Sequence, residues 1–192
     1  MAAVSAPPPA ERIPGPRVVL ERVAERHVEA LRRIHHRPEV ARWWPPMGDE
    51  WPLDDDESVV GYAVALRDGG RICGFVQYGE DDDPDYRSAS IDVFVDPAVH
   101  GRGLGREVVA LLAAYLIDGR GHHRVTIDPA TVNTTAIRAY AAVGFRPVGV
   151  MRRYERAPDG TWRDGLLMDL LAHELVRPET LAGAAAGPAT PP

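Results

Sequence analysis

The sequence contains no lysine: all 22 of its basic residues are arginine, and 28 acidic residues outnumber them. The net charge of −6 argues against nonspecific nucleic-acid binding, which depends on neutralising phosphates, and it suits a cationic partner. The absence of lysine also excludes a phosphate-binding P-loop, because the pattern Gly-x4-Gly-Lys-Ser/Thr requires that residue.

Cysteine and long apolar runs are equally scarce. The single Cys73 cannot form an internal disulfide, which favours a reducing compartment, and its neighbours in Ile72-Cys73-Gly74-Phe75-Val76 predict a buried packing role. No apolar run reaches the ~18 residues of a membrane helix, and residues 1–10 lack the basic start and apolar stretch of a signal peptide. We therefore expect a cytoplasmic protein with no membrane partner.

Length and composition predict one domain. The chain has 192 residues, of which 45% are hydrophobic and 26% charged. Residues 1–15 and 178–192 are rich in alanine and proline and are expected to be disordered tails, which leaves a domain over residues 16–177. His35 and His36 are adjacent, so on a helix they diverge by about 100°, and no carboxylate or cysteine lies at ligand spacing. We expect solvated histidines and no metal site.

Alternation and helical spacing give the order of the elements. Strands are expected at 17–23, 59–67, 71–78, 88–95, 122–128, 145–155 and 162–170, and helices at 25–36, 104–116 and 131–143. Residues 54–57 could cap a short helix or face solvent. The order predicts an α+β fold: a largely antiparallel sheet of six to seven strands, with one parallel junction, flanked by helices.

A glycine-rich loop, His100-Gly101-Arg102-Gly103-Leu104-Gly105-Arg106, joins the strand at 88–95 to the next helix. A helix N-terminus leaves backbone N–H groups unpaired, its dipole adds positive charge, and glycine lets a phosphate approach the backbone. The dinucleotide fingerprint Gly-x-Gly-x-x-Gly does not fit, because Arg106 occupies its last position. The loop predicts a phosphate site, with a tight strand-to-helix turn as the alternative.

A second motif lies on the helix expected at 131–143. Asn133, Ala136, Ile137 and Tyr140 fall at i, i+3, i+4 and i+7, so they share one face. The segment from Asn133 to Phe145 resembles the signature Asn-x-x-Ala-x-x-x-Tyr-x-x-x-Gly-Phe of the GNAT superfamily of acetyltransferases. The glycine-rich loop resembles the loop with which these enzymes hold the pyrophosphate of acetyl-CoA. From the residues alone, Asn133 could be only an N-cap and Tyr140 only a core aromatic.

The resemblance covers roughly residues 17–175 and implies a GNAT fold with acetyl-CoA as co-substrate. In that family the strand before the glycine-rich loop and the next strand splay apart, and the cofactor lies between them. Tyr140 would be the general acid, and His100 stands where the family usually has arginine or glutamine. The residues that the resemblance implies for cofactor binding are Phe94, Val95, His100, Gly101, Arg102, Gly103, Leu104, Gly105, Arg106 and Asn133.

Two aspartates interrupt or end apolar strands. Asp92 faces away from Ile91 and Val93, and Asp128 follows Ile127 at a strand end. Buried acids are costly unless they meet cations or hydrogen bonds. If the two strands adjoin, both carboxylates converge near the gap, where they could hold an ammonium group and Asp128 could take its proton, directly or through water. The alternatives are a backbone hydrogen bond for Asp92 and an Asp-Pro turn for Asp128.

The chain resembles one GNAT branch in particular, the aminoglycoside 6′-N-acetyltransferases. The matching pieces are Val40 to Trp44, Ile91-Asp92, the glycine-rich loop, and Ile127 to Tyr140. The resemblance implies a small cationic amine substrate, an aminoglycoside antibiotic, bound by Trp44, Asp92 and Asp128, with Asp128 as the base and direct transfer in a ternary complex. Trp44 could instead form a core corner.

Two other functions stay open. One is N-acylation of lysine-type or hydroxylysine-type amines in siderophore assembly, and the other is a non-catalytic module that binds a CoA ester or an antibiotic. The sequence leaves monomer and homodimer equally open.

Overall fold

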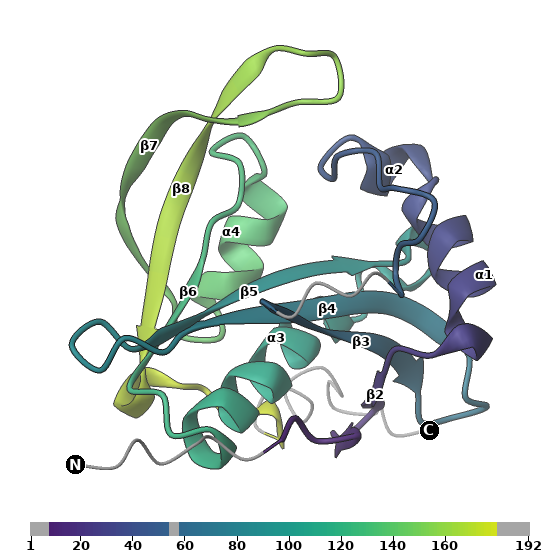
Figure 1. Cartoon of the computed structure of the whole chain (residues 1–192), viewed down its shortest axis with the longest axis horizontal. Helices are drawn as coiled ribbons and strands as arrows, with labels where there is room; N and C mark the ends of the chain where they lie inside the picture. Colours follow the sequence, from purple (N-terminus) through teal and green to yellow (C-terminus); the bar gives the residue numbers. More distant parts are fainter. Residues whose placement is uncertain (1–7, 54–57, 180–192) are drawn as a thin grey trace, which may run out of the picture.

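The computed structural model describes residues 8–53 and 58–179, and within these ranges eight strands form one sheet (Figure 1). The strands are β1 (Arg12–Pro14), β2 (Val18–Arg22), β3 (Val59–Leu66), β4 (Ile72–Asp81), β5 (Ser88–Val95), β6 (Arg124–Ile127), β7 (Arg146–Arg156) and β8 (Trp162–Leu171). The helices are α1 (Glu25–His35), α2 (Pro38–Ala41), α3 (Leu104–Ala114) and α4 (Thr134–Ala141).

The sheet order is β1-β2-β3-β4-β5-β6-β8-β7. Every neighbouring pair is antiparallel except β5 and β6, which confirms the predicted α+β fold with one parallel junction. The predicted strand count was too low. The eighth strand is β1, which lies in the stretch assigned to the N-terminal tail and pairs with β2 through Ile13 and Leu20. Residues 54–57, and the predicted tails at 1–7 and 180–192, lie outside the described residues.

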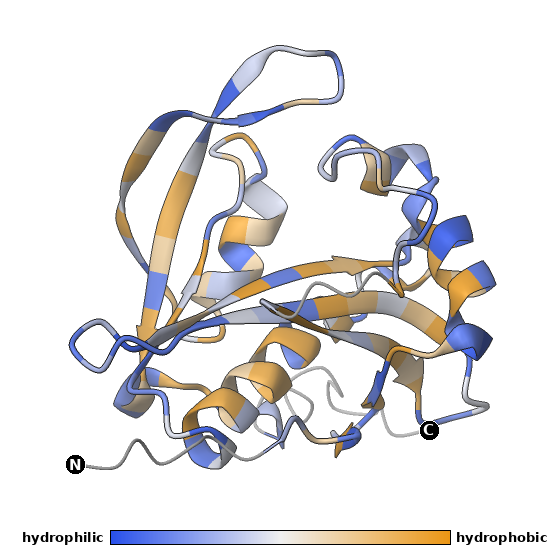
Figure 2. Ribbon diagram, viewed as in Figure 1, coloured by the Kyte–Doolittle hydropathy of each residue, from blue (hydrophilic) through white to orange (hydrophobic). Residues whose placement is uncertain are grey.

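The helices cover opposite faces of the sheet, with α3 on one face and α1 and α2 on the other (Figure 1). Because side chains alternate along a strand, Val64 packs in the cluster around α3 whereas Ala63 packs in the cluster under α1. Helix α3 is apolar on nearly all sides, as Figure 2 shows, and eight of its eleven residues are buried. None of the helices within the described ranges is long and apolar enough to cross a membrane.

Two predictions about single residues have opposite outcomes. Cys73 is fully buried, as expected, and burial raises the pKa of its thiol to about 11. His35, expected in solvent, is only 4% exposed and packs against Trp44, Trp51 and Phe94. The reason is its place on α1: it follows Leu31 by four residues and therefore lies on the same apolar face.

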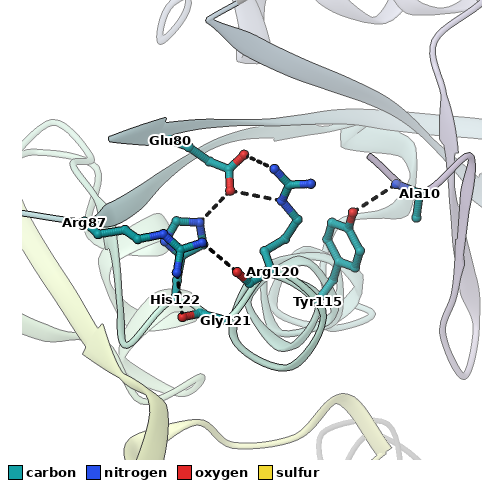
Figure 3. A network of polar contacts seen from close by, with 7 residues as sticks. All are labelled: Ala10, Glu80, Arg87, Tyr115, Arg120, Gly121 and His122. Atoms are coloured by element: carbon teal, nitrogen blue, oxygen red, sulfur yellow. Dashed lines mark hydrogen bonds and ion pairs between the residues drawn. The ribbon is translucent and has the colours of Figure 1, made fainter. Parts of the chain in front are cut away.

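A buried polar network fixes the end of α3 and the start of β6 (Figure 3). Glu80 of β4 accepts hydrogen bonds from Arg120 Nε at 3.0 Å and from Arg120 Nη2 at 2.5 Å, and its Oε1 also lies 2.6 Å from His122 Nε2. Burial opposes ionisation of Glu80, but these two partners outweigh it and hold the pKa of the carboxyl below its usual value. Arg87 then binds the Arg120 carbonyl at 2.7 Å, so the network ties the chain entering β6 to β4 and to the segment before β5.

The parallel junction is short. Strands β5 and β6 are in register only at Ala89 with Val125 and at Ser90 with Thr126. Beyond these pairs β5 continues to Val95 along β4, while β6 continues along β8. The two strands therefore splay apart, as the family resemblance predicted, and the residues after Ser90 and Thr126 face a gap in the sheet.

Candidate active site

One large cleft opens at this gap, with a volume of about 1230 Å³. Its walls come from β5, β6, the glycine-rich loop, α4, the segment after α2, and the β7–β8 hairpin. Nearly all the site residues predicted from sequence line it: Trp44, Asp92, Phe94, Val95, His100, Gly101, Gly103, Leu104, Gly105, Arg106, Asp128, Asn133 and Tyr140. Arg102 is the exception, because it does not line the cleft.

The glycine-rich loop needs its glycines. Gly101 and Gly103 have φ of 75° and 72°, in the left-handed region that side chains disfavour, and Gly103 is the residue from which α3 starts. Ahead of the loop, Asp96 caps a helical turn at Pro97–Val99 by accepting the Ala98 N–H at 2.9 Å. The loop thus aims the N-terminus of α3 at the cleft, where its free N–H groups and dipole favour an anion.

A buried ion pair anchors the loop from behind. Glu107, in the first turn of α3, is fully buried and accepts the backbone N–H of Arg17 at 2.7 Å and its Nε at 2.6 Å. Arg17 also donates from Nη1 to the Arg102 carbonyl at 2.9 Å. Arg17 therefore balances the one acidic side chain of the first turn and holds the loop backbone at the same time.

The end of β5 presents backbone groups to the cleft. Asp96 donates its N–H to Cys73 of β4, and the alternation of an antiparallel ladder then turns the N–H and C=O groups of Val93 and Val95 away from β4 and toward the gap. His100 Nε2 lies 3.0 Å from the Val95 carbonyl oxygen, so this backbone group already has a hydrogen-bond partner within the protein. The other groups of this strand end are placed to pair with an extended ligand in the manner of strand addition.

Asp92 and Asp128 lie near each other because β5 and β6 run parallel. Asp92 follows Ser90 by two residues and Asp128 follows Thr126 by two, so both side chains leave the same face on either side of the gap. Asp92 accepts a hydrogen bond from Gln77 Nε2 at 3.1 Å rather than from a backbone group. Burial raises the pKa of both carboxyls; the nearby charge of Glu155 adds to the rise for each, and that of Asp92 adds to the rise for Asp128.

The cleft residues that sequence reasoning did not find include Tyr154, Glu155 and Arg163 of the β7–β8 hairpin. Tyr154 is half exposed and lines the cleft, and a hydrogen bond from it lowers the pKa of Asp128. Glu155 forms an ion pair with Arg163 Nε at 2.5 Å, and the Arg163 guanidinium also donates to the Trp43 carbonyl at 2.9 Å. Arg163 therefore joins the hairpin to the segment after α2 across the cleft rim.

The aromatic residues take mixed roles. Trp44 lines the cleft and also packs on Phe94, with ring centroids 5.1 Å apart, so it belongs to the aromatic cluster under α1 and also forms part of the cleft wall. Tyr140 is partly buried and packs on Phe145 at 6.4 Å. Burial, together with the charges of Asp92 and Asp128, raises the pKa of the Tyr140 phenol, which keeps it protonated as a proton donor must be.

Asn133 does serve as an N-cap, since its Oδ1 accepts the Ala136 N–H at 3.2 Å. It also lines the cleft, so its amide NH₂ stays available to a ligand. Among the described residues, no group of three or more metal-ligating side chains occurs.

Comparison with known proteins gives one family. The model of the acetyltransferase (GNAT) family matches residues 21–145. The N-alpha-acetyltransferase RimI of Mycobacterium tuberculosis is 32% identical over 116 residues, which are 59% of this chain and 68% of that protein. Mycothiol acetyltransferase of Salinispora arenicola is 31% identical over 130 residues, which are 66% of this chain but only 42% of that protein.

Solved structures share the fold. Mycobacterium smegmatis RimJ, in complex with CoA-disulfide, has a TM-score of 0.75 and 25% identity, with 87% of this chain and 88% of that one covered. AAC(6')-Ib, in complex with paromomycin and acetyl-CoA, has a TM-score of 0.67 and 22% identity, with 83% of this chain and 96% of that one covered.

Proposed function

The chain belongs to the GNAT family of acetyltransferases and transfers acetyl groups from acetyl-CoA to an amine, and we propose that this amine is the 6′-amine of an aminoglycoside antibiotic. The observation that carries the proposal is the paired placement of Asp92 and Asp128 across the gap, with Glu155 within electrostatic reach of both. Three acids in one cleft suit a polycation far better than a neutral or singly charged amine.

Acetyl-CoA fits the opposite end of the cleft. The α3 N-terminus and the backbone of Gly101, Gly103 and Gly105 would hold the pyrophosphate, with Arg106 adding charge. The groups of Val93 and Val95 that face the gap would pair with the pantetheine arm, and the thioester would then lie between Asp128 and Tyr140. AAC(6')-Ib, whose structure holds both an aminoglycoside and acetyl-CoA, shares this fold.

The reaction then needs no covalent enzyme intermediate. Asp128 accepts a proton from the ammonium group, the free amine attacks the thioester carbonyl, and the C–S bond breaks as the carbonyl re-forms. Tyr140 gives its proton to the departing thiolate, and the second proton that the nitrogen loses as the amide forms restores the Tyr140 phenol. Asp92, held by Gln77, would bind a second ammonium group and orient the acceptor. The raised pKa of Asp128 makes it a stronger base than an ordinary carboxylate.

A second acceptor is the α-amine of a protein. The match to RimI, which is named an N-alpha-acetyltransferase, favours it. A peptide N-terminus carries one positive charge and could neutralise only one of Asp92 and Asp128, since Glu155 already pairs with Arg163, which is why we place it second.

The test is a thiol-release assay with acetyl-CoA and matched acceptors. Neomycin and paromomycin differ only at the 6′ position, amine against hydroxyl, so turnover of neomycin alone supports the proposal and locates the transfer. A peptide and its Nα-blocked form test the second acceptor, spermine tests polyamine chemistry, and a lysine-type and a hydroxylysine-type amine test siderophore chemistry. Binding of acetyl-CoA without turnover of any amine would refute the proposal and identify a binding module.

A further inference from the structure

The strand that carries Tyr154 is interrupted where it passes the cleft. Met151 of β7 is opposite Gly165 of β8, and Glu155 is opposite Arg163, so Arg152-Arg153-Tyr154 face the single residue Asp164. At the centre of this bulge Arg153 has φ of 50°, a backbone conformation that costs about 1–2 kcal/mol for a residue other than glycine. Its N–H donates to Asp164 Oδ1 at 2.7 Å, which holds the bulge in place.

The bulge brings the Tyr154 ring down onto β8. A Cβ atom at Gly165 would lie 2.8 Å from Tyr154 Cδ1, so the ring takes the space that only glycine leaves. The same stretch of β8 also fixes the chain after Asp128. Leu166 donates its N–H to the Pro129 carbonyl at 2.8 Å, and Thr131 donates to the Asp164 carbonyl at 2.9 Å. Tyr154 and the segment that carries Asp128 thus share one backbone support.

From this geometry we infer that Tyr154 is a positioning residue for Asp128: its ring is held over Gly165, which pairs with Ala130 two residues after Asp128, and its hydroxyl orients the carboxylate as the base. The inference rests on the proposed role of Asp128 in acetyl transfer. The strained bulge sets the position of the Tyr154 hydroxyl. In a regular strand residues 152–154 would pair with β8 one by one, and the Tyr154 ring would not be placed at the cleft in this way.

The other groups that face Asp128 act in the opposite direction. Burial raises the pKa of Asp128, and the carboxylates of Asp92 on β5 and Glu155 on β7 add to the rise. Glu155 is partly balanced by Arg163 of β8. The Tyr154 hydrogen bond lowers the pKa of Asp128, and Asp128 in turn raises the pKa of Tyr154 to about 12, so the phenol stays a donor.

The experiment compares Tyr154→Phe, which removes only the hydroxyl, with Tyr86→Phe at a tyrosine that is 75% exposed and does not line the cleft. Two readouts are used: the pH profile of kcat/KM with an amine that is turned over, and the carboxyl titration of Asp128 by ¹³C NMR, assigned with Asp128→Asn. Gly165→Ala is a second route, because it retains the hydroxyl but displaces the ring.

We expect Tyr154→Phe to shift the acidic limb of kcat/KM to higher pH, with a loss of about three- to tenfold on that limb that shrinks as the pH rises, the size of one hydrogen bond to a charged group at a half-exposed site. The Asp128 titration should move upward in Tyr154→Phe and in Gly165→Ala, and not in Tyr86→Phe. An unchanged titration, or a loss that is equal at all pH values, overturns the inference.

The titration needs no acceptor, so it separates the two hypotheses. A shifted Asp128 titration in a protein that acetylates no aminoglycoside refutes the proposed substrate and leaves the Tyr154–Asp128 contact standing.

Discussion

Arg17 is the residue whose loss should connect stability and cofactor binding most directly. It is the cation that faces the fully buried Glu107, and it also holds the Arg102 carbonyl in the glycine-rich loop. Arg17→Ala leaves a buried carboxylate without its charged partner just behind the site proposed for the pyrophosphate. We expect lower stability and weaker binding of acetyl-CoA from this one change.

The size of the effect follows from the geometry. Removing one partner of a buried ion pair costs about 3–5 kcal/mol. Arg17 is one-third exposed, and its backbone N–H still donates to Glu107 at 2.7 Å in the variant, so the cost is expected to lie at or below the lower end of that range, at about 2–3 kcal/mol. In a chain of this size each kcal/mol shifts Tm by about 2–4 °C, which gives a fall of about 4–12 °C.

Thermal unfolding followed by circular dichroism, and KM for acetyl-CoA, are the measurements. Arg12→Ala is the control, because Arg12 pairs with Glu21 at 3.6 Å while 65% exposed, and such surface pairs contribute at most about 1 kcal/mol. In a Glu107→Gln background the same Arg17→Ala change should cost less than half as much. Equal Tm values for Arg17→Ala and Arg12→Ala would refute the reasoning, as would a KM for acetyl-CoA that stays at the wild-type value.

Three further predictions follow from the cleft. Tyr140→Phe should lower kcat about 100-fold with KM for acetyl-CoA unchanged, in steady-state assays; an unchanged kcat removes Tyr140 from the acid role. Asp92→Asn should raise Tm at pH 7, because a carboxyl whose pKa is raised on folding lowers the stability of the protein above that pKa. This gain in Tm should vanish as the pH falls toward about 4. The same variant should raise KM for a polycationic acceptor about tenfold. Gly74→Ala should cost about 1–3 kcal/mol in urea unfolding, since its Cβ would lie 2.5 Å from the Phe94 carbonyl oxygen, whereas Gly149→Ala, with open space, should be neutral.

The fold was readable from the sequence because its signals are local. The turn sequence Asp68-Gly69-Gly70 between two alternating runs predicts the hairpin of β3 and β4, and both strands form close to the predicted bounds. The strand β1 carries no such signal: three residues ending at Pro14 in a proline-rich stretch have no strand pattern of their own. They become a strand only through pairing with β2, which buries Ile13 to 7% exposure.

The same difference between local and distant signals separates the site residues that could be predicted from those that could not. Asp92 and Asp128 could be paired in advance, because Asp92 lies in a strand with clear alternation, Asp128 directly follows another, and a parallel register brings equal positions together. Tyr154 could not, because the bulge at Arg152 to Tyr154 breaks the alternation from which a side chain's direction is read. Arg17 and Glu107 are 90 residues apart, and a contact between such distant positions leaves no mark on either local pattern.

Charge is separated along the cleft, and this explains how one groove can serve two unlike substrates. The glycine-rich loop and the α3 N-terminus favour anionic phosphates, while Asp92, Asp128 and Glu155 favour a cation at the other end. A cationic amine is unreactive until it loses a proton, so the acids that attract the acceptor must include one able to take that proton. In the proposed mechanism Asp128 would meet both needs, because burial and its acidic neighbours raise its pKa while the hydrogen bond from Tyr154 favours its charged form. Replacing Glu155 by Gln should therefore weaken acceptor binding and, by removing a like charge, move the acidic limb of kcat/KM to lower pH, opposite to Tyr154→Phe.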